Sequence, residues 1–327
     1  MSLKSKIIGF VAGKYRAYKQ QRAEERAGFK AISQREAYLL EPTLTIREKQ
    51  HYCERKGYAQ LKYFPNLDEP KTYSEKLIWL ALHYKDPRIA PYTDKCEMKK
   101  HVSQLVGPEY CVPLLGVYDN VNDIDFDALP KGFVLKSTAG WANRQVIVVP
   151  DKGKINLDRL KSKLAEWLYP WNTYYYANLC VTDEKITPRI IAEELLGDGS
   201  SPVTDYKLLC FDGEPKIILI VTGRGTKKLQ KTFLWLEDWS VLPIARNNAG
   251  TDMTVEKPDK LDELVALAKK LSAGFPIVRV DFYEDQGHIY VGELTFSPGL
   301  FLKINPTESD YSMGGLIDID KVRNQGN

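Results

Sequence analysis

The chain has 327 residues, 43% of them apolar, and a formal net charge of +3. This length supports a full hydrophobic core and predicts two subdomains around a cleft, whereas the small charge argues against a nucleic-acid partner. Five cysteines without a CxxC pair indicate a reduced, cytoplasmic protein, and four histidines without metal-ligand spacing support neither a zinc site nor a Ser-His-Asp arrangement.

Residues 1–85 are predicted to be helical, with a break at Phe64-Pro65-Asn66. Residues 1–22 mix apolar side chains with lysines and arginines and lack a cleavage site, so we predict no signal peptide. No stretch of the chain approaches the roughly 18 apolar residues of a membrane span. A basic amphipathic helix at 1–22 suits contact with the anionic inner face of a membrane, and a helix packed on the body of the protein is an equally good interpretation.

A phosphate-binding loop is predicted after the first strands. A helix at 95–105 and an apolar strand at 111–118 precede the stretch 133–149, FVLKSTAGWANRQVIVV, which predicts a strand, a loop of small residues and a second strand. Lys136 ends the first strand of this pair, where its ammonium suits phosphate oxygens that loop amides also approach. The loop residues are Ser137, Thr138 and Gly140. Neither GxxxxGK[ST] nor GxGxxG spacing is present, so a lysine at a solvent edge is the alternative.

A helix at 156–168 then precedes the strand RIIAEELL, which two glutamates interrupt. Neighbouring strand residues face opposite ways, so either Glu193 or Glu194 must point inward and needs a hydrogen-bond donor. An adenine amino group and a lysine or arginine of the protein fit that need equally well. The next hairpin turns at Asp212-Gly213, a strand passes Phe233, and a helix runs from 258 to 271 with Gly274 behind it. Three cations on the later strands are spaced to face one cleft: Lys207, Arg224 and Arg279.

Residues 275–299, FPIVRVDFYEDQGHIYVGELTFSPG, predict a β-hairpin. Alternation gives each strand an apolar face: Val278, Val280 and Phe282 on the first, and Tyr290, Leu294 and Phe296 on the second. For these faces to share a side, the loop needs an odd number of residues, and Asp285-Gln286-Gly287 supplies three.

The opposite face of this hairpin then collects Arg279, Asp281, Glu293 and Thr295. Carboxylates are the hard oxygen ligands that Mg²⁺ prefers, and a guanidinium binds phosphate oxygens. Cross-strand ion pairing on an exposed sheet face is the alternative. Two carboxylates so close repel each other unless a cation separates them, which favours a metal site.

In this order, the segments resemble the TupA-like ATP-grasp family found among bacterial surface-polysaccharide genes. The likeness covers roughly residues 60–315 and rests on YTDKCEMKKHV, VPLLGVYDNVNDIDFDALPKGFVLK, PRIIAEELL, DYKLLCFDGEPK, and FPIVRVDFY with GELTFSPG. The resemblance implies an α+β ATP-grasp fold. Two α+β subdomains, residues 86–197 and 198–327, would hold a nucleotide between them, and residues 1–85 would form a helical N-terminal extension.

The resemblance also implies ATP and Mg²⁺ as cofactors. Lys136 and the loop residues would contact the ATP phosphates, and Glu193, with Glu194 beside it and the Leu195-Leu196 backbone, would hold adenine. Asp281, Glu293 and Thr295 would bind Mg²⁺, and Arg279, Lys207 and Arg224 would act on the transferred phosphate. Two departures from the family pattern are Thr295, where many ATP-grasp enzymes have asparagine, and the loop TAGWAN with Trp141, where relatives often have a stretch like HGSG.

The implied activity is ATP-dependent ligation of a carboxylate to an amine through an acyl phosphate. The expected partners are a carboxylate-bearing glycan, such as a uronic acid of a capsule or O-antigen, and an amino acid or other amine. The aromatic stretch from Tyr169 to Tyr176 offers stacking faces for sugar rings, although such residues more often belong to a core. The alternatives are a glycosyltransferase of the same pathway and a nucleotide-binding assembly protein without turnover.

Overall fold

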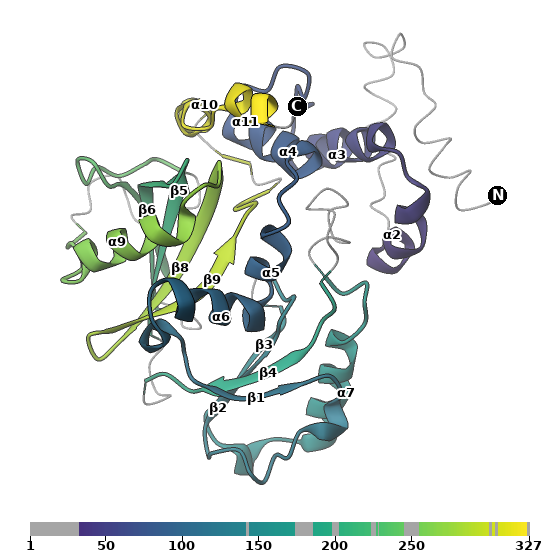
Figure 1. The fold of residues 1–327 in the computed structure, drawn as a ribbon, viewed down its shortest axis with the longest axis vertical. Helices are drawn as coiled ribbons and strands as arrows, with labels where there is room; N and C mark the ends of the chain where they lie inside the picture. The colour runs from purple at the N-terminus through teal and green to yellow at the C-terminus, as the bar shows by residue number, and fades with distance from the viewer. Residues whose placement is uncertain are drawn as a thin grey trace.

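Two antiparallel sheets form the framework of the protein (Figure 1). The computed structural model describes residues 33–141, 144–173, 186–197, 203–223, 227, 229–244, 255–300, 303–304 and 307–325. The four-stranded sheet has the order β1-β4-β2-β3, with β1 at Leu114–Tyr118, β2 at Phe133–Ser137, β3 at Val146–Val149 and β4 at Ile190–Glu194. The five-stranded sheet has the order β7-β6-β5-β8-β9, with β5 at Thr204–Phe211, β6 at Glu214–Thr222, β7 at Gln230–Trp235, β8 at Ile277–Asp285 and β9 at His288–Thr295.

One helix covers the outer face of the four-stranded sheet. Helix α7 (Leu157–Trp167) begins where the Asn156 side chain accepts a hydrogen bond from the Arg159 amide, as the predicted cap requires. Its Leu160 and Leu164 pack with strand residues into one buried cluster. The Phe133 side of β2 therefore faces a core, and Lys136 on the opposite side points to Tyr283 of the other sheet.

Helix α9 (Leu261–Ser272) packs on one face of the five-stranded sheet, where Leu264 and Leu267 meet the alternate β8 residues that the sequence assigned to the core, Val278, Val280 and Phe282. Helices α5 (Ile89–Thr93) and α6 (Lys95–Leu105) lie between the two sheets (Figure 1). Short 3₁₀ turns lie at Pro108–Tyr110, Val121–Asp123 and Lys152–Lys154.

The N-terminal helices are α2 (Gln34–Leu40), the 3₁₀ turn Glu41–Thr43, α3 (Ile46–Leu61) and α4 (Tyr73–His83). Helices α2, α3 and α4 each begin with a capping box, in which a serine or threonine and a glutamate three residues later satisfy the free amides. Helices α10 (Thr307–Gly315) and α11 (Ile319–Gln325) join α4 over one end of the five-stranded sheet (Figure 1). No helix within the described ranges is both long enough and apolar enough to cross a bilayer.

Most predicted elements are confirmed, but the helix predicted at 258–271 begins at Leu261, and two further predictions about strand and loop bounds are wrong. The predicted helix at 95–105 and the turn at Asp212-Gly213 are present as predicted. Strand β1 begins at Leu114 rather than Cys111, which makes only an isolated bridge to Val291. The predicted three-residue loop of the last hairpin is also wrong: Asp285 pairs with His288, so the turn has two residues.

That turn, Gln286-Gly287, has φ angles of 52° and 76°, as a two-residue hairpin with both residues left-handed requires. The register changes instead within the strands, because Phe282 pairs with Val291 whereas Asp281 pairs with Glu293. A β-bulge at Gly292 therefore does what the odd loop was predicted to do.

The bulge also reverses the predicted face of one aromatic residue. Between the turn and Gly292, Ile289 and Val291 join the buried core, and the predicted core residue Tyr290 does not. Beyond the bulge Leu294 is buried as predicted, and Phe296 packs against the same core.

Candidate functional site

A buried carboxylate on the four-stranded sheet lies between two lysines. Glu193 on β4 and Lys136 on β2 are both buried, and Lys136 Nζ lies 2.5 Å from Glu193 Oε2. Lys99 Nζ of α6 lies 2.8 Å from Glu193 Oε1 and donates to the Val112 carbonyl at 2.7 Å. Of the two predicted glutamates, Glu193 thus points inward and Glu194 is exposed. The donors are lysines of the protein, and Lys136 is not at a solvent edge.

Electrostatics keep Glu193 and Lys136 ionised. Burial favours the neutral acid, but Lys136 and Lys99 outweigh it and lower the pKa of Glu193. Burial likewise works to lower the pKa of Lys136, but the Glu193 carboxylate together with Tyr283 and Glu293 outweighs burial and raises it. Two ammonium groups against one carboxylate leave a net positive charge, which suits an anion.

The second cluster lies on the five-stranded sheet, around Asp281. Arg279 Nε donates to Asp281 Oδ1 at 2.5 Å, and its Nη2 donates to Oδ2 at 2.8 Å and to Thr295 Oγ1 at 3.1 Å. Lys207 on β5 is hydrogen-bonded to Asp281 and lies 3.8 Å from Asp205 Oδ2. Burial tends to raise the pKa of Asp281, but Arg279 and Lys207 outweigh burial and lower it.

The hairpin brings the predicted metal ligands together. Asp281 is directly opposite Glu293, and Arg279 is directly opposite Thr295. The Asp281 side chain is 3% exposed, whereas that of Glu293 is 27% exposed. The predicted alternative of an exposed face is therefore wrong for Asp281, but its cross-strand ion pairing is present, because Lys207 lies directly opposite Asp281 on β5 and pairs with it. Two neighbouring carboxylates are a donor set that fits Mg²⁺, and Glu293 is the more open of the two, because both oxygens of Asp281 already accept hydrogen bonds from Arg279 or Lys207.

The two clusters meet through Tyr283 of β8. Lys136 Nζ lies 5.4 Å from the centre of the Tyr283 ring, and Glu293 is close enough to help raise the pKa of Lys136. Gly292 makes room for this ring, since a Cβ at that position would lie 2.6 Å from Tyr283 Cε2. The bulge at Gly292 therefore sets both the register of Glu293 and the place of the ring that faces Lys136.

Sequence reasoning missed Lys95, the first residue of α6. Its amide donates to the Thr138 carbonyl at 3.0 Å, its Nζ donates to the Gly140 carbonyl at 2.7 Å, and Nζ lies 3.9 Å from Glu293 Oε1. Lys95 and Lys99 are four residues apart on the same helix, beside the buried Met98 and Val102. That spacing places both lysines on one face and was the available signal.

The other predicted site residues differ in how exposed they are. Ser137 and Thr138 are buried, Gly140 and Leu196 are partly exposed, and Glu194 points away from Glu193. A Cβ at Gly140 would lie 2.9 Å from the Gln145 Cβ, so this turn of the loop excludes larger residues. Tyr169 and Trp171 stack on each other, with ring centres 4.8 Å apart. Arg224, residues 174–176 and residues 1–22 lie outside the described residues.

A family model described as TupA-like ATPgrasp matches residues 75–318. No curated protein matches the sequence. Among solved structures, the ATP-grasp ligase PsnB complexed with its minimal precursor is 15% identical, with a TM-score of 0.39, and the match covers 75% of this chain and 63% of PsnB. The chain thus spans less than two thirds of PsnB. The D-alanine–D-alanine ligase from Bacillus anthracis, complexed with ATP, is 18% identical, with a TM-score of 0.44 and coverage of 76% and 70%.

Proposed function

Since this chain belongs to the TupA-like ATP-grasp family, we propose that it is an ATP- and Mg²⁺-dependent ligase that joins a carboxylate to an amine. The observation that carries the proposal is the meeting of two charged clusters, Lys99–Glu193–Lys136 and Lys207–Asp281–Arg279, between the two sheets. One supplies cations for the phosphates of a nucleotide. The other supplies one carboxylate, with Glu293 directly opposite it, for a metal, and two cations for the phosphate that is transferred.

The nucleotide contacts follow from charge and position. Lys95 donates to the Gly140 carbonyl of the loop and Lys136 comes directly before Ser137, so we assign the ATP phosphates to these two lysines. Glu193, whose oxygens are already shared by Lys99 and Lys136, fixes Lys136 in place, and the partly exposed Leu195-Leu196 backbone next to it is assigned to adenine. Asp281 and Glu293 are assigned to Mg²⁺, which would neutralise phosphate charge when bound.

Two steps make up the proposed reaction. A carboxylate oxygen of the substrate attacks the γ-phosphorus, the bond to ADP breaks, and an acyl phosphate forms. The amine nitrogen then attacks the acyl carbon, the bond to phosphate breaks, and the nitrogen gives its proton to water. Negative charge grows on phosphoryl oxygens in the first step and on a tetrahedral oxyanion in the second. We assign the stabilisation of both charges to Arg279 and Lys207, which are hydrogen-bonded to Asp281.

For the substrates, we propose a uronic acid of a bacterial surface polysaccharide and an amino acid or similar amine. The family resemblance supports the glycan, and the mutually stacked Tyr169 and Trp171 offer an aromatic surface near the loop that follows α7. We further propose that the reaction takes place in the cytoplasm, with residues 1–22 contacting the inner face of the membrane.

The test combines purified protein, ATP, Mg²⁺, a uronic-acid glycan and pooled amino acids. A ligase releases phosphate only when both substrates are present and adds the mass of an amide-linked residue to the glycan. Consumption of a UDP-sugar without ATP would instead indicate a glycosyltransferase. Tight ATP binding without product from any pool would indicate an assembly protein.

A further inference from the structure

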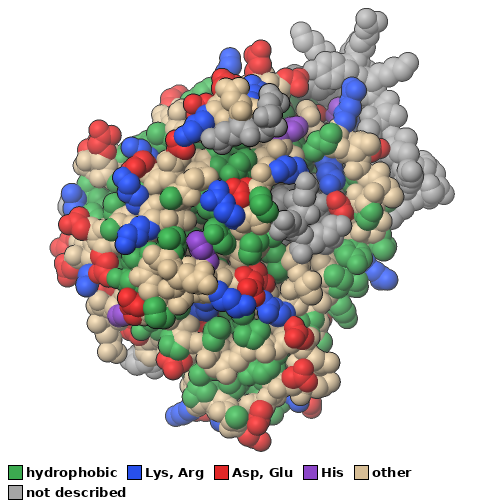
Figure 2. Space-filling model, viewed as in Figure 1, with side chains coloured by type: hydrophobic (Ala, Val, Ile, Leu, Met, Phe, Trp, Pro, Cys, Tyr) green, Lys and Arg blue, Asp and Glu red, His purple; other side chains and the backbone are tan. Residues whose placement is uncertain are grey.

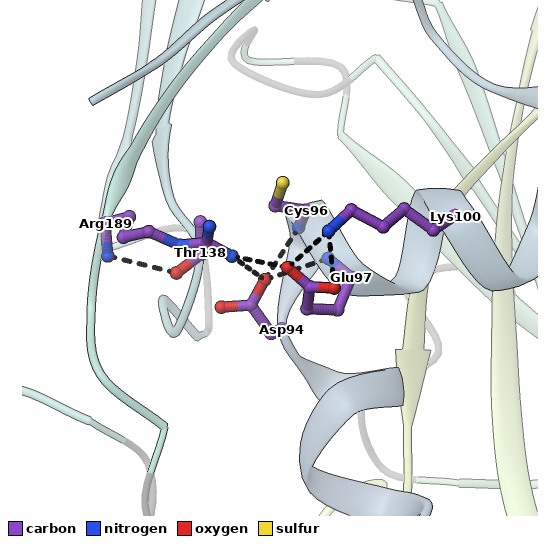
Figure 3. Close-up of polar contacts among 6 residues, drawn as sticks. All are labelled: Asp94, Cys96, Glu97, Lys100, Thr138 and Arg189. Atoms are coloured by element: carbon purple, nitrogen blue, oxygen red, sulfur yellow. Dashed lines mark hydrogen bonds and ion pairs between the residues drawn. The ribbon is translucent and has the colours of Figure 1, made fainter. Parts of the chain in front are cut away.

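Three segments that are distant in sequence are tied together by one ring of hydrogen bonds at the start of α6 (Figure 3). The Lys95 amide donates to the Thr138 carbonyl at 3.0 Å, and the Thr138 amide donates to the Arg189 carbonyl at 2.9 Å. The Arg189 amide donates to Thr138 Oγ1 at 3.1 Å. The Arg189 guanidinium then closes the ring on α6, with Nη2 at 2.9 Å from Glu97 Oε1 and 3.3 Å from Asp94 Oδ1.

The two carboxylates in this ring, Asp94 and Glu97, also make other interactions. Asp94 Oδ1 caps α6 by accepting from the amides of Cys96 at 2.9 Å and Glu97 at 3.0 Å. Glu97 also pairs with Lys100 at 2.8 Å on its outer side (Figure 3). Asp94, Cys96 and Glu97 have the spacing of a metal site, but two cations neutralise the two carboxylates, and burial raises the pKa of the Cys96 thiol. Acidic and basic side chains lie next to one another at the level of α6 on the surface as well (Figure 2).

Each member of the ring is close in sequence to a residue that we assign to the nucleotide. Asp94 precedes Lys95, whose Nζ reaches the loop at Gly140 and faces Glu293. Thr138 follows Lys136 by two residues, at the end of β2. Arg189 comes directly before β4, the strand that carries Glu193. The ring therefore fixes the three elements that carry these nucleotide contacts against one another.

We propose that Arg189 is a positioning residue that sets Lys95 and the loop at Ser137–Gly140 in the arrangement that binds ATP phosphates. This inference rests on the proposed function. Arg189 itself touches neither loop carbonyl nor Lys136 through its side chain among the described contacts, so its effect passes through Asp94, Glu97 and the backbone of Thr138. The planar guanidinium of Arg189 donates hydrogen bonds to two carboxylates at once. A lysine ammonium, on a shorter side chain, would bind both carboxylates less well.

The experiment measures binding of ATP with Mg²⁺, and separately of adenosine, by calorimetry to the full chain. Arg189→Met is expected to weaken ATP binding about tenfold, the low end for loss of hydrogen bonds to charged groups, and Arg189→Lys about threefold, because a lysine keeps part of the interaction; adenosine binding is unchanged. Lys100→Gln is the matched control, because Lys100 binds the same Glu97 from the outer side and has no hydrogen bond or ion pair with the described residues of the loop. Its ATP affinity should equal that of the wild type.

The ratio of ATP to adenosine affinity separates positioning from general stability. An Arg189 that only stabilises the fold would lower both affinities together or lower neither, and either result in the folded Arg189→Lys variant overturns the inference. Equal loss in Lys100→Gln overturns it as well. If the wild type itself binds no ATP, the proposed function fails and the inference fails with it. If the wild type binds ATP but Arg189→Lys binds ATP as tightly as the wild type, only the inference fails.

Discussion

Both charged clusters place one buried carboxylate between two cations, but they differ in openness. In the cluster on the four-stranded sheet, the side chains of Lys99, Lys136 and Glu193 are all less than a tenth exposed. In the cluster on the five-stranded sheet, Arg279 is 21% exposed and the neighbouring Glu293 is 27% exposed. A closed cluster holds its members in fixed positions, whereas an open one is able to meet a metal and a reacting phosphate. We therefore propose that the first cluster holds residues of the nucleotide site in position and that the second takes part in the reaction.

The largest effect is expected for Glu193→Gln, which tests the structural role of the closed cluster. This variant removes the negative charge between two buried lysines. We expect the free energy of unfolding to fall by about 3–5 kcal/mol, as when one partner of a buried ion pair is lost. Urea denaturation measures it. The matched control is Glu194→Gln, the exposed neighbour on the same strand, with a change within about 0.5 kcal/mol. Similar losses in both variants would show that the buried cluster is not a structural unit.

Asp281→Asn tests the role of the more open cluster in the reaction. It keeps the shape of the side chain and removes its charge. Turnover of ATP with both substrates should fall by about 10²–10³, the usual effect of losing one preorganised charge in an active site. Glu293→Gln should act similarly, and both losses should depend on the Mg²⁺ concentration. Full activity in both variants would exclude the metal assignment. Glu214→Gln, an exposed acid on β6, serves as the control.

The sequence predicts the hairpin that carries Asp281 and Glu293 but not how its register is made. For the apolar residues of both strands to share one face, the hairpin needs one residue more than a regular two-residue turn supplies. A three-residue loop and a bulge within a strand meet that requirement equally well. Local residues decided the question: Gln286-Gly287 suits a two-residue turn, and Gly292 permits the bulge. A glycine inside an otherwise regular strand was the missed signal.

The partners of Glu193 could not be predicted for a different reason. Strand alternation requires that one glutamate point inward, but its donors come from α6 and β2, which are distant in sequence. Lys95 and Lys99 occupy a helix whose charged residues look like a solvated face until the sheets enclose it. Pairings between distant elements depend on tertiary packing, which a single sequence does not display.

A third prediction tests whether Lys95 of α6 contributes to ATP binding. Lys95→Met keeps the length of the side chain and removes the ammonium that donates to Gly140 and faces Glu293. ATP affinity, measured by calorimetry with Mg²⁺, should fall about 10- to 100-fold, as expected for hydrogen bonds to a charged group. Lys100→Gln, an exposed lysine on the same helix, should leave it unchanged. Undiminished affinity in Lys95→Met would remove Lys95 from the site.

The smallest expected effect concerns the contact between the two sheets. Gly292→Ala places a Cβ 2.6 Å from the Tyr283 ring, so the ring or the bulge must move. We expect a loss of about 1–3 kcal/mol in the free energy of unfolding, as for other overpacked sites. Thermal and urea unfolding check this value. Gly315→Ala is the control, because a Cβ there meets nothing within 4 Å. A neutral Gly292→Ala would mean that the bulge tolerates a side chain.

The central claim is that both clusters bind one nucleotide, and a crystal structure with a non-hydrolysable ATP analogue and Mg²⁺ tests it most directly. We predict phosphates beside Lys95 and Lys136, with the metal at Asp281 and Glu293 and adenine beside the Leu195-Leu196 backbone. Phosphates bound away from these lysines, or a metal bound without either carboxylate, would contradict the account.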